Sequence, residues 1–321
     1  MHLVARFDLN KLCLFLASPT CGDAELDPSE KSNCRCPPLL HNAEDGYGTA
    51  VQNLPIQKAY FDLKDRNGRT PLSWAAEHGT LEVAKPLLKT GQVDIESRDK
   101  IGQTPLSRAA KYGSLEVARL LLDTGRAEAD SRDDTGRSPL SWTAENGQLE
   151  VARLLLDTGR VEPDSRDDTG RSPLSHAKGR SPEVAQLFID TGQVDVDSRD
   201  NTGRTPFSWA AQKFTSSNIE VATLLLNTGN VEVDSRDDAG RTPLSWAASS
   251  AAEGLAGLLL NAGRAEADSR DDAGRTPLSW VSSISSLGAR LVRTLILVEL
   301  RLTQGITLAG RLCHGLQNHF I

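Results

Sequence analysis

The chain has 321 residues, a net charge of −7, and 38% hydrophobic but only 5% aromatic residues, a composition that suits helices packed through leucine, valine and alanine. It contains no apolar run near the roughly 18 residues that a membrane-spanning helix needs, so we expect no contact with the bilayer core. Acidic residues outnumber basic ones in residues 61–280, which argues against binding of a nucleic-acid backbone.

Residues 1–60 are rich in Pro, Gly, Asn and Asp and predict a loosely ordered leader. The apolar residues 12–17 resemble part of a signal peptide. The charged residues Asp8 and Lys11 lie just before them and keep the apolar stretch short, so we do not expect secretion. No cysteine lies within residues 37–312, which is typical of a reducing compartment. We therefore expect a cytoplasmic protein, and a nuclear location stays open.

After the leader, the phrase Arg-(Thr/Ser)-Pro-Leu-Ser-Trp recurs seven times with small variations. Its prolines are 33 to 37 residues apart, and such a period indicates a stacked repeat array. We number the repeats one to seven by these prolines: Pro71, Pro105, Pro139, Pro173, Pro206, Pro243 and Pro277.

Residues 133–159 show the structure expected of one repeat. Ser138 is expected to cap a first helix over about residues 139–146, whose first residue is a proline. A second helix is expected over about residues 149–157, with Gly159 in the left-handed conformation ending it. A projecting loop then leads to the next repeat. One copy cannot bury its apolar face, so several copies must stack.

The combined pattern Asp-x-x-Gly-x-Thr-Pro-Leu-x-x-Ala-Ala…Gly-x-Leu-Glu-Val…Leu-Leu-Leu-x-x-Gly over residues 62–280 resembles the ankyrin repeat. The resemblance implies an all-α solenoid of stacked helix-turn-helix units with projecting loops, about six full repeats plus a degenerate seventh. We expect a leader over 1–60, the array over 61–280, and a degenerate capping repeat or helical tail over 281–321. A truncated or mistranslated tail stays open.

Two features set these repeats apart within that family. A serine occupies the family's usual histidine position after Pro-Leu, and its shorter reach puts the rigidity of the projecting loop in question. The Asp-Ser-Arg-Asp loops resemble those of fungal ankyrin arrays, which are often attached to NACHT-type signalling NTPases. The serines are Ser73, Ser107, Ser141, Ser175, Ser208, Ser245 and Ser279.

Three repeats carry irregularities. Pro86 falls inside the second helix of repeat one, where a proline costs about 3 kcal/mol. Pro182 follows Ser181 and is expected at the first position of a helix. Three extra residues around positions 214–218 predict a protruding bulge between the helices of repeat five.

Sequence signals for chemistry are weak. There is no phosphate-binding loop motif. Residues 130–134 resemble a calcium loop, but Arg132 stands where an oxygen ligand belongs. The Ser, His and Asp residues show no shared catalytic geometry. Cysteine spacing matches no ordinary zinc site; the cysteines are Cys13, Cys21, Cys34, Cys36 and Cys313, with His41 nearby. We therefore expect no enzyme activity, cofactor or metal.

All five tryptophans occupy one position of the repeat, where repeats two and four carry Arg108 and His176. The favoured interpretation is packing between neighbouring repeats. The alternative is a ladder of partly exposed indoles that binds a partner. The presence of arginine and histidine at this position favours partial exposure. The tryptophans are Trp74, Trp142, Trp209, Trp246 and Trp280.

An arginine precedes the Thr/Ser-Pro pair in six repeats. We expect it to pair with loop aspartates of the neighbouring repeat. The alternative is that it points into the concave groove and binds acidic partners. These arginines are Arg69, Arg137, Arg171, Arg204, Arg241 and Arg275.

The ankyrin resemblance implies that a protein partner meets the loop tips and the inner-helix surface. We expect a monomeric, non-catalytic scaffold; the alternative is a recognition fragment of a larger signalling NTPase. The sequence does not identify the partner. The expected binding residues are Arg66, Asn67, Arg69, Trp74, Lys100, Ile101, Gln103, Arg108, Lys111, Tyr112, Asp134, Arg137, Trp142, Glu145, Asn146 and His176.

Overall fold

The computed structural model describes residues 61–177, 182–212, 215–250, 252–261 and 265–282. Across these segments the regular secondary structure is entirely helical. Within them, no helix has both the length and the apolar character needed to cross a membrane. The expectations for the leader over 1–60 and for nearly all of the tail fall outside the described residues.

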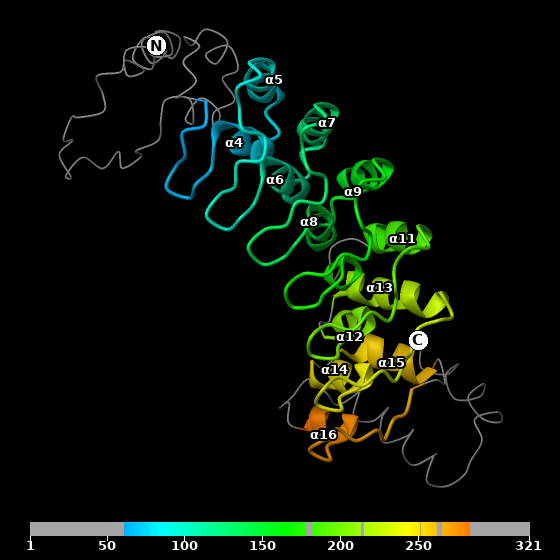
Figure 1. Cartoon of the computed structure of the whole chain (residues 1–321). Helices are drawn as coiled ribbons and strands as arrows, with labels where there is room; N and C mark the ends of the chain where they lie inside the picture. The colour runs from blue at the N-terminus through cyan, green and yellow to red at the C-terminus, as the bar shows by residue number, and fades with distance from the viewer. Residues whose placement is uncertain (1–60, 178–181, 213–214, 251, 262–264, 283–321) are drawn as a thin grey trace, which may run out of the picture. The chain divides into compact units, whose positions relative to one another are not determined.

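The chain divides into two compact units. The first unit, Met1–Ala177 with Asp190–Val194, contains repeats one to three and the first helix of repeat four (Figure 1). Its helices are α4 Pro71–His78, α5 Leu81–Lys89, α6 Pro105–Tyr112, α7 Leu115–Asp123, α8 Pro139–Asn146, α9 Leu149–Asp157 and α10 Pro173–His176.

The second unit, Lys178–Ile189 with Asp195–Ile321, contains the remaining described helices. In it, α12, α14 and α16 form one row, and α13 lies beside α15 in a second row. The helices are α11 Pro182–Asp190, α12 Pro206–Ala211, α13 Ser216–Asn227, α14 Pro243–Ser249, α15 Glu253–Asn261 and α16 Pro277–Ser282.

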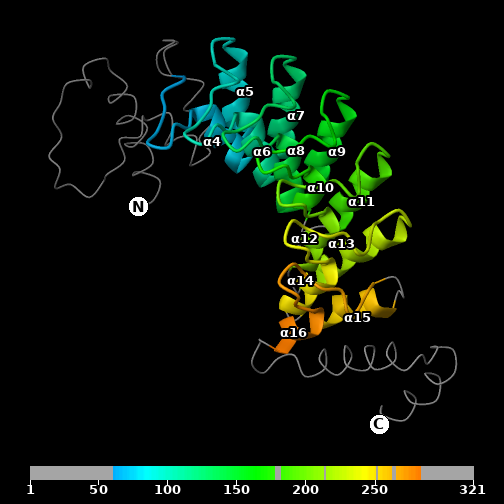
Figure 2. The ribbon, with the colours of Figure 1, turned by 60° about the horizontal axis from the view of Figure 1, so that its bottom comes forward.

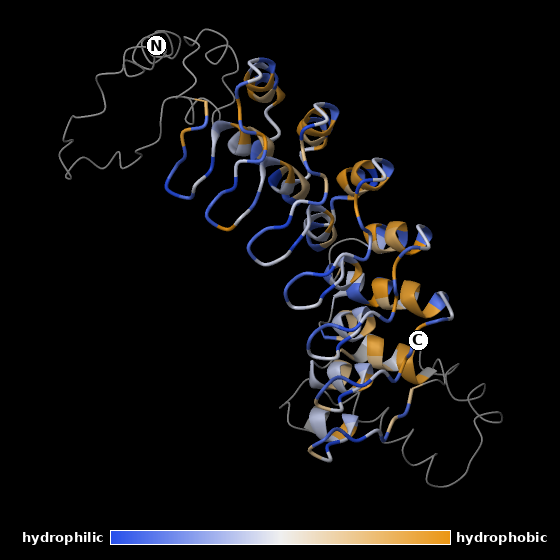
Figure 3. Cartoon of the chain, in the orientation of Figure 1, coloured by the Kyte–Doolittle hydropathy of each residue, from blue (hydrophilic) through white to orange (hydrophobic). Residues whose placement is uncertain are grey.

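Within the first unit the helices form two parallel rows. The inner row consists of α4, α6, α8 and α10, each in contact with the next, and the outer row consists of α5, α7 and α9 (Figure 2). The projecting loops are hydrophilic, whereas apolar residues concentrate on the helices (Figure 3). The leucine of each Pro-Leu pair is fully buried at Leu72, Leu106 and Leu140, so the repeats share one continuous core.

Local capping chemistry explains where the helices begin and end. In repeat three, the Ser138 side chain accepts a hydrogen bond from the backbone N–H of Ser141, and Pro139 is the first helical residue of α8. Gly147 follows α8 with φ 72°, and Gly159 follows α9 with φ 61°. Both conformations favour glycine. The predicted helices of this repeat and their caps are confirmed.

The irregular repeats differ in outcome. Pro86 lies within α5, which continues to Lys89, and Pro182 is the first residue of α11 as predicted. The predicted bulge in repeat five is wrong for residues 216–218, which form the first turn of the twelve-residue helix α13. This extra turn is stable because Asn218 is buried and its side-chain amide donates to the Ala210 carbonyl at 2.9 Å.

Candidate protein-binding surface

A buried aspartate at the base of each projecting loop organises the inner face of its repeat. In repeat two, Oδ1 of Asp99 accepts the backbone N–H groups of Ile101 and Gln103, both at 2.9 Å. These bonds fix the turn and leave Oδ2 facing the inner helix. We call these residues the loop-base aspartates: Asp65, Asp99, Asp133, Asp167, Asp200, Asp237 and Asp271.

In repeats one to six the second oxygen binds the side chain nine residues further on, at the tryptophan position. Trp142 donates its Nε1–H to Oδ2 of Asp133 at 3.0 Å. Arg108 donates its Nε–H to Asp99 at 2.9 Å, and Nε2 of His176 lies 2.9 Å from Asp167. Tryptophan, arginine and histidine can therefore each occupy this position, because each carries an N–H that reaches the loop-base aspartate.

This shared role corrects one expectation from the sequence. Arginine and histidine at the tryptophan position were interpreted as a sign of partial exposure. Arg108 is 7% exposed and His176 0% exposed, so both are more deeply buried than the half-buried Trp74 and Trp142. The substitutions preserve a buried hydrogen bond and do not indicate an open surface.

Hydrogen bonds hold several of these aspartates in the ionised form. Burial alone would raise the pKa of Asp167, but hydrogen bonds from His176, Thr169 and the backbone of Arg171 place that pKa well below its usual range. Burial lowers the pKa of His176, although its bond to Asp167 opposes this. A neutral His176 at pH 7 therefore donates its Nε2–H to the Asp167 carboxylate.

Arginines and tryptophans also stack on one another along the inner face. In the second unit, the guanidinium of Arg204 lies between two indoles, 3.7 Å from the Trp209 ring and 3.9 Å from the Trp246 ring. Arg241 continues the stack over Trp246 at 4.4 Å. Cation–π contacts of this kind join neighbouring repeats. Trp209 is 8% exposed, so packing accounts for it, whereas Trp74, Trp142, Trp246 and Trp280 remain half-buried.

The predicted pairing of the recurrent arginines with the neighbouring repeat is wrong at several positions. Arg69 lies 2.8 Å from Asp65, and Arg275 lies 2.9 Å from Asp271, each within its own repeat. A spacing of four residues across the turn brings these groups together locally. At Arg137 the predicted contact is present at 3.8 Å from Asp167, beside a 2.7 Å contact to Glu145 of its own repeat.

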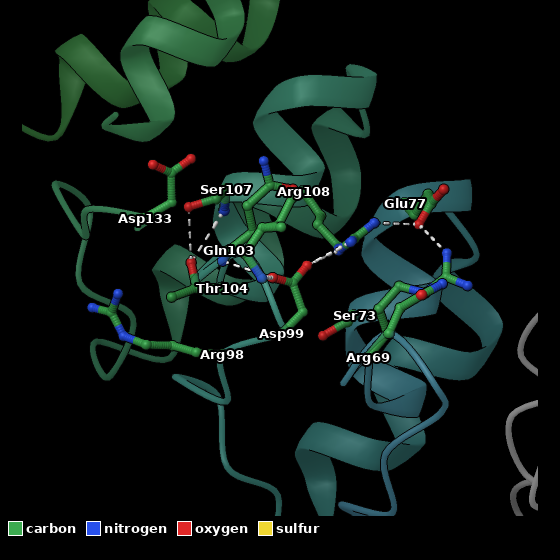
Figure 4. A network of polar contacts seen from close by, with 12 residues as sticks. Arg69, Ser73, Glu77, Arg98, Asp99, Gln103, Thr104, Ser107, Arg108 and Asp133 are labelled. Carbon is green, nitrogen blue, oxygen red and sulfur yellow. Dashed lines mark hydrogen bonds and ion pairs between the residues drawn. The ribbon is translucent and has the colours of Figure 1, made fainter. Parts of the chain in front are cut away.

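Hydroxyl groups tie the projecting loop of repeat two to its inner helix and to the next repeat. The Thr104 hydroxyl lies 3.1 Å from that of Ser107 in its own repeat (Figure 4). It also lies 3.1 Å from the Ser131 hydroxyl of the next repeat. Arg98 donates to the carbonyls of Gly102 and Arg132. The loops of repeats two and three are thus tied to each other and to their helices, although serine occupies the position where the family resemblance implies histidine.

One network in Figure 4 joins the first two inner helices. Glu77 of α4 accepts from Arg108 of α6 at 2.6 Å and from Arg69 at 3.2 Å. Arg108 also binds Asp99. The charges of these two arginines are therefore balanced by carboxylates of the protein.

The sixteen expected binding residues fall into three groups. Arg66, Asn67, Lys100, Ile101, Tyr112 and Asp134 are exposed. Arg69, Trp74, Lys111, Arg137, Trp142, Glu145 and Asn146 are half-buried. Gln103, Arg108 and His176 are buried and present almost no surface to a partner.

The sequence interpretation missed His78. This exposed side chain stacks on Trp74, with ring centroids 5.2 Å apart and planes 12° apart. Its position four residues after Trp74 on α4 is the signal that could have revealed it. Trp74 and His78 together form an aromatic surface at the first repeat.

Metal binding finds no support in the described part of the chain, where no group of three or more His, Cys, Asp or Glu side chains could hold an ion. The cysteines and His41 lie outside the described residues.

Comparisons with known proteins agree on the fold. A family model described as ankyrin repeats (3 copies) matches residues 39–133, 82–165, 125–199, 159–237 and 177–271, which together exceed half of the chain. A crystal structure of the human ASB11 ankyrin repeat domain is similar, with a TM-score of 0.60 and 23% identity. The match covers 72% of this chain and 98% of that one. Comparison with curated protein sequences gave no match.

Proposed function

Because the chain belongs to the ankyrin repeat family, we propose that it is a non-catalytic scaffold whose loop tips and inner helices bind a protein partner. The inner face of repeats one to three supplies the surface. Trp74, Lys111 and Trp142 are half-buried there, and Tyr112 is exposed on the same row of helices. Aromatic side chains in such a position are frequent anchors of protein interfaces.

The proposal is supported by the difference between inner-face residues that form internal hydrogen bonds and those that remain accessible. The loop-base aspartates, Arg108 and His176 are committed to internal hydrogen bonds. What remains accessible varies from repeat to repeat: His78 at the end of α4, and Lys111 and Tyr112 at the end of α6. A constant interior with a variable surface is the arrangement expected of a recognition array.

The test is binding of the native partner to full-length chain after the double substitution K111A/Y112A. The matched control is E116A/R119A, which alters two exposed residues of the outer helix α7. We expect capture from native cell extract to fall at least about tenfold with the first variant. The control variant is expected to retain capture. Equal capture by both variants would show that the inner face of repeat two is not the binding surface.

A second function rests on the resemblance of the Asp-Ser-Arg-Asp loops to arrays attached to NACHT-type signalling NTPases. In that case the array is the recognition part of a larger protein. An in-frame upstream segment encoding a phosphate-binding loop would support this prediction.

A further inference from the structure

Repeat two carries a lysine followed by a large apolar residue at the tip of its projecting loop and again at the end of its inner helix. Lys100 and Ile101 stand at the tip of the projecting loop, and Lys111 and Tyr112 stand at the end of α6. Ile101 is 50% exposed and Tyr112 46% exposed. Leu63, at 36%, is the other exposed large apolar residue in the described part of the chain. We call these four residues the repeat-two patch.

No other described repeat has this pair of dipeptides. Repeat three has Asp134-Thr135 at its loop tip and Glu145-Asn146 at the end of α8. Repeat one has Glu77-His78 at the end of α4. The helices and loops around these positions are otherwise closely similar, so folding does not require the lysines or the exposed apolar side chains.

The lysines of the patch also differ from the nearby arginines in their pairing. Glu77 and Asp99 neutralise Arg108, and Glu145 neutralises Arg137. In the described residues, neither Lys100 nor Lys111 forms a salt bridge. Lys111 instead lies over aromatic rings, with Nζ 4.4 Å from the Trp142 centroid and 5.7 Å from the Tyr112 centroid. This contact positions a cation beside an exposed aromatic ring.

We propose that the repeat-two patch binds an extended acidic segment of the protein partner, with an apolar side chain at each end of that segment. This inference rests on the proposed function. Its carboxylates pair with Lys100 and Lys111, and its apolar residues contact Ile101 and Tyr112. Lys100 and Ile101 lie at the loop tip, before the first residue of α6, so the bound segment must reach from the loop tip to the end of α6.

Charge decides between this occupant and a nucleic acid. The loop tips of the next two repeats carry Asp134 and Asp168, which would repel a continuous phosphate backbone. The two lysines can pair with the carboxylates of a short segment that stays on repeat two, and the exposed apolar residues supply contacts that a phosphate backbone does not use.

Selection of random peptides displayed on phage against the full-length chain tests the proposal. The variant K100D/I101T/K111E/Y112N gives repeat two the residues that repeat three carries at the same positions. The transplanted variant carries these four substitutions together with D134K/T135I/E145K/N146Y, which moves the patch to repeat three. All substitutions are at exposed or half-buried positions, and circular dichroism would verify that both variants remain helical.

We expect the selected peptides to be acidic and to contain apolar residues. Fluorescence anisotropy should show at least about tenfold weaker binding of the synthetic peptide to the swapped variant, with recovery in the transplanted variant. Neutral or basic selected peptides, failure to select any, or equal binding to the swapped variant would overturn the proposal.

Two further outcomes distinguish a failure of this inference from a failure of the proposed function. If sedimentation shows self-association that the swap abolishes, the occupant is a second copy and the assignment to a partner's segment is wrong. If the native partner is lost with K111A/Y112A but its contacting segment, found by cross-linking, is not acidic, this inference fails while the proposed function stands.

Discussion

Replacing Trp142 with phenylalanine tests whether the loop-base aspartates hold the inner helices in place. Phenylalanine keeps a ring next to Arg137 and Lys111 but lacks the Nε1–H that donates to Asp133 at 3.0 Å. A hydrogen bond to a charged group contributes about 1.5–3 kcal/mol. Because Trp142 is half-buried and water can replace part of the bond, we expect the pair to contribute about 1–2 kcal/mol.

The loss must be separated from the smaller size of phenylalanine. A double-mutant cycle with W142F and D133A does so, because the coupling energy excludes the packing cost of each single change. Urea unfolding of the full-length chain, followed by circular dichroism, measures the four free energies of unfolding. The control cycle pairs W142F with D134A, since Asp134 is exposed at the loop tip and makes no bond to Trp142.

We expect a coupling of about 1–2 kcal/mol for W142F with D133A and no coupling in the control cycle. A value for the first cycle as small as that of the control would refute the idea that one aspartate links each loop to its inner helix.

Three other predictions concern ionisable side chains that are buried or half-buried. R108W should retain stability within about 1 kcal/mol, whereas R108L should lose about 3 kcal/mol by leaving Oδ2 of the buried Asp99 carboxylate without a partner, as measured by urea unfolding. Burial lowers the pKa of His176, so below about pH 6.5 the unfolded chain binds the proton more readily. Stability should therefore fall between pH 6.5 and 5 in the natural chain but less in H176W; identical pH profiles by thermal melting would contradict this. Burial raises the pKa of Asp130 to about 6, which makes its ionised form unfavourable at pH 7. D130N should melt at a higher temperature at pH 7, and this gain should vanish by about pH 4, where protonation already stabilises the natural residue.

Local signals made the helices of repeat three predictable from sequence. Ser138 and Pro139 define the start of α8, and Gly147 and Gly159 take left-handed conformations that few other residues adopt. Each of these effects acts within one turn of the chain, so sequence order is sufficient to recognise it.

Contacts over longer distances were harder to predict. The common role of tryptophan, Arg108 and His176 depends on an aspartate nine residues earlier and on a donor N–H that three dissimilar side chains share. The pairing of Arg69 with Asp65 depends on the turn geometry. The first turn of α13 depends on the buried amide of Asn218. None of these follows from hydrophobic periodicity.

The candidate surface was predictable in part. Repeat-to-repeat variation pointed to Lys100, Ile101, Lys111 and Tyr112, which the structure places at exposed or half-buried positions. Variation also pointed to Gln103, which is fully buried. Sequence alone does not separate a variable side chain that faces solvent from one that neighbouring side chains cover.

Hydrogen–deuterium exchange of the full-length chain, with and without its captured partner, tests the central claim most directly. The account predicts slowed exchange in residues 98–112 and in α8 when the partner is bound, with α5, α7 and α9 unchanged. Protection confined to the outer helices, or no protection in repeats one to three, would contradict it.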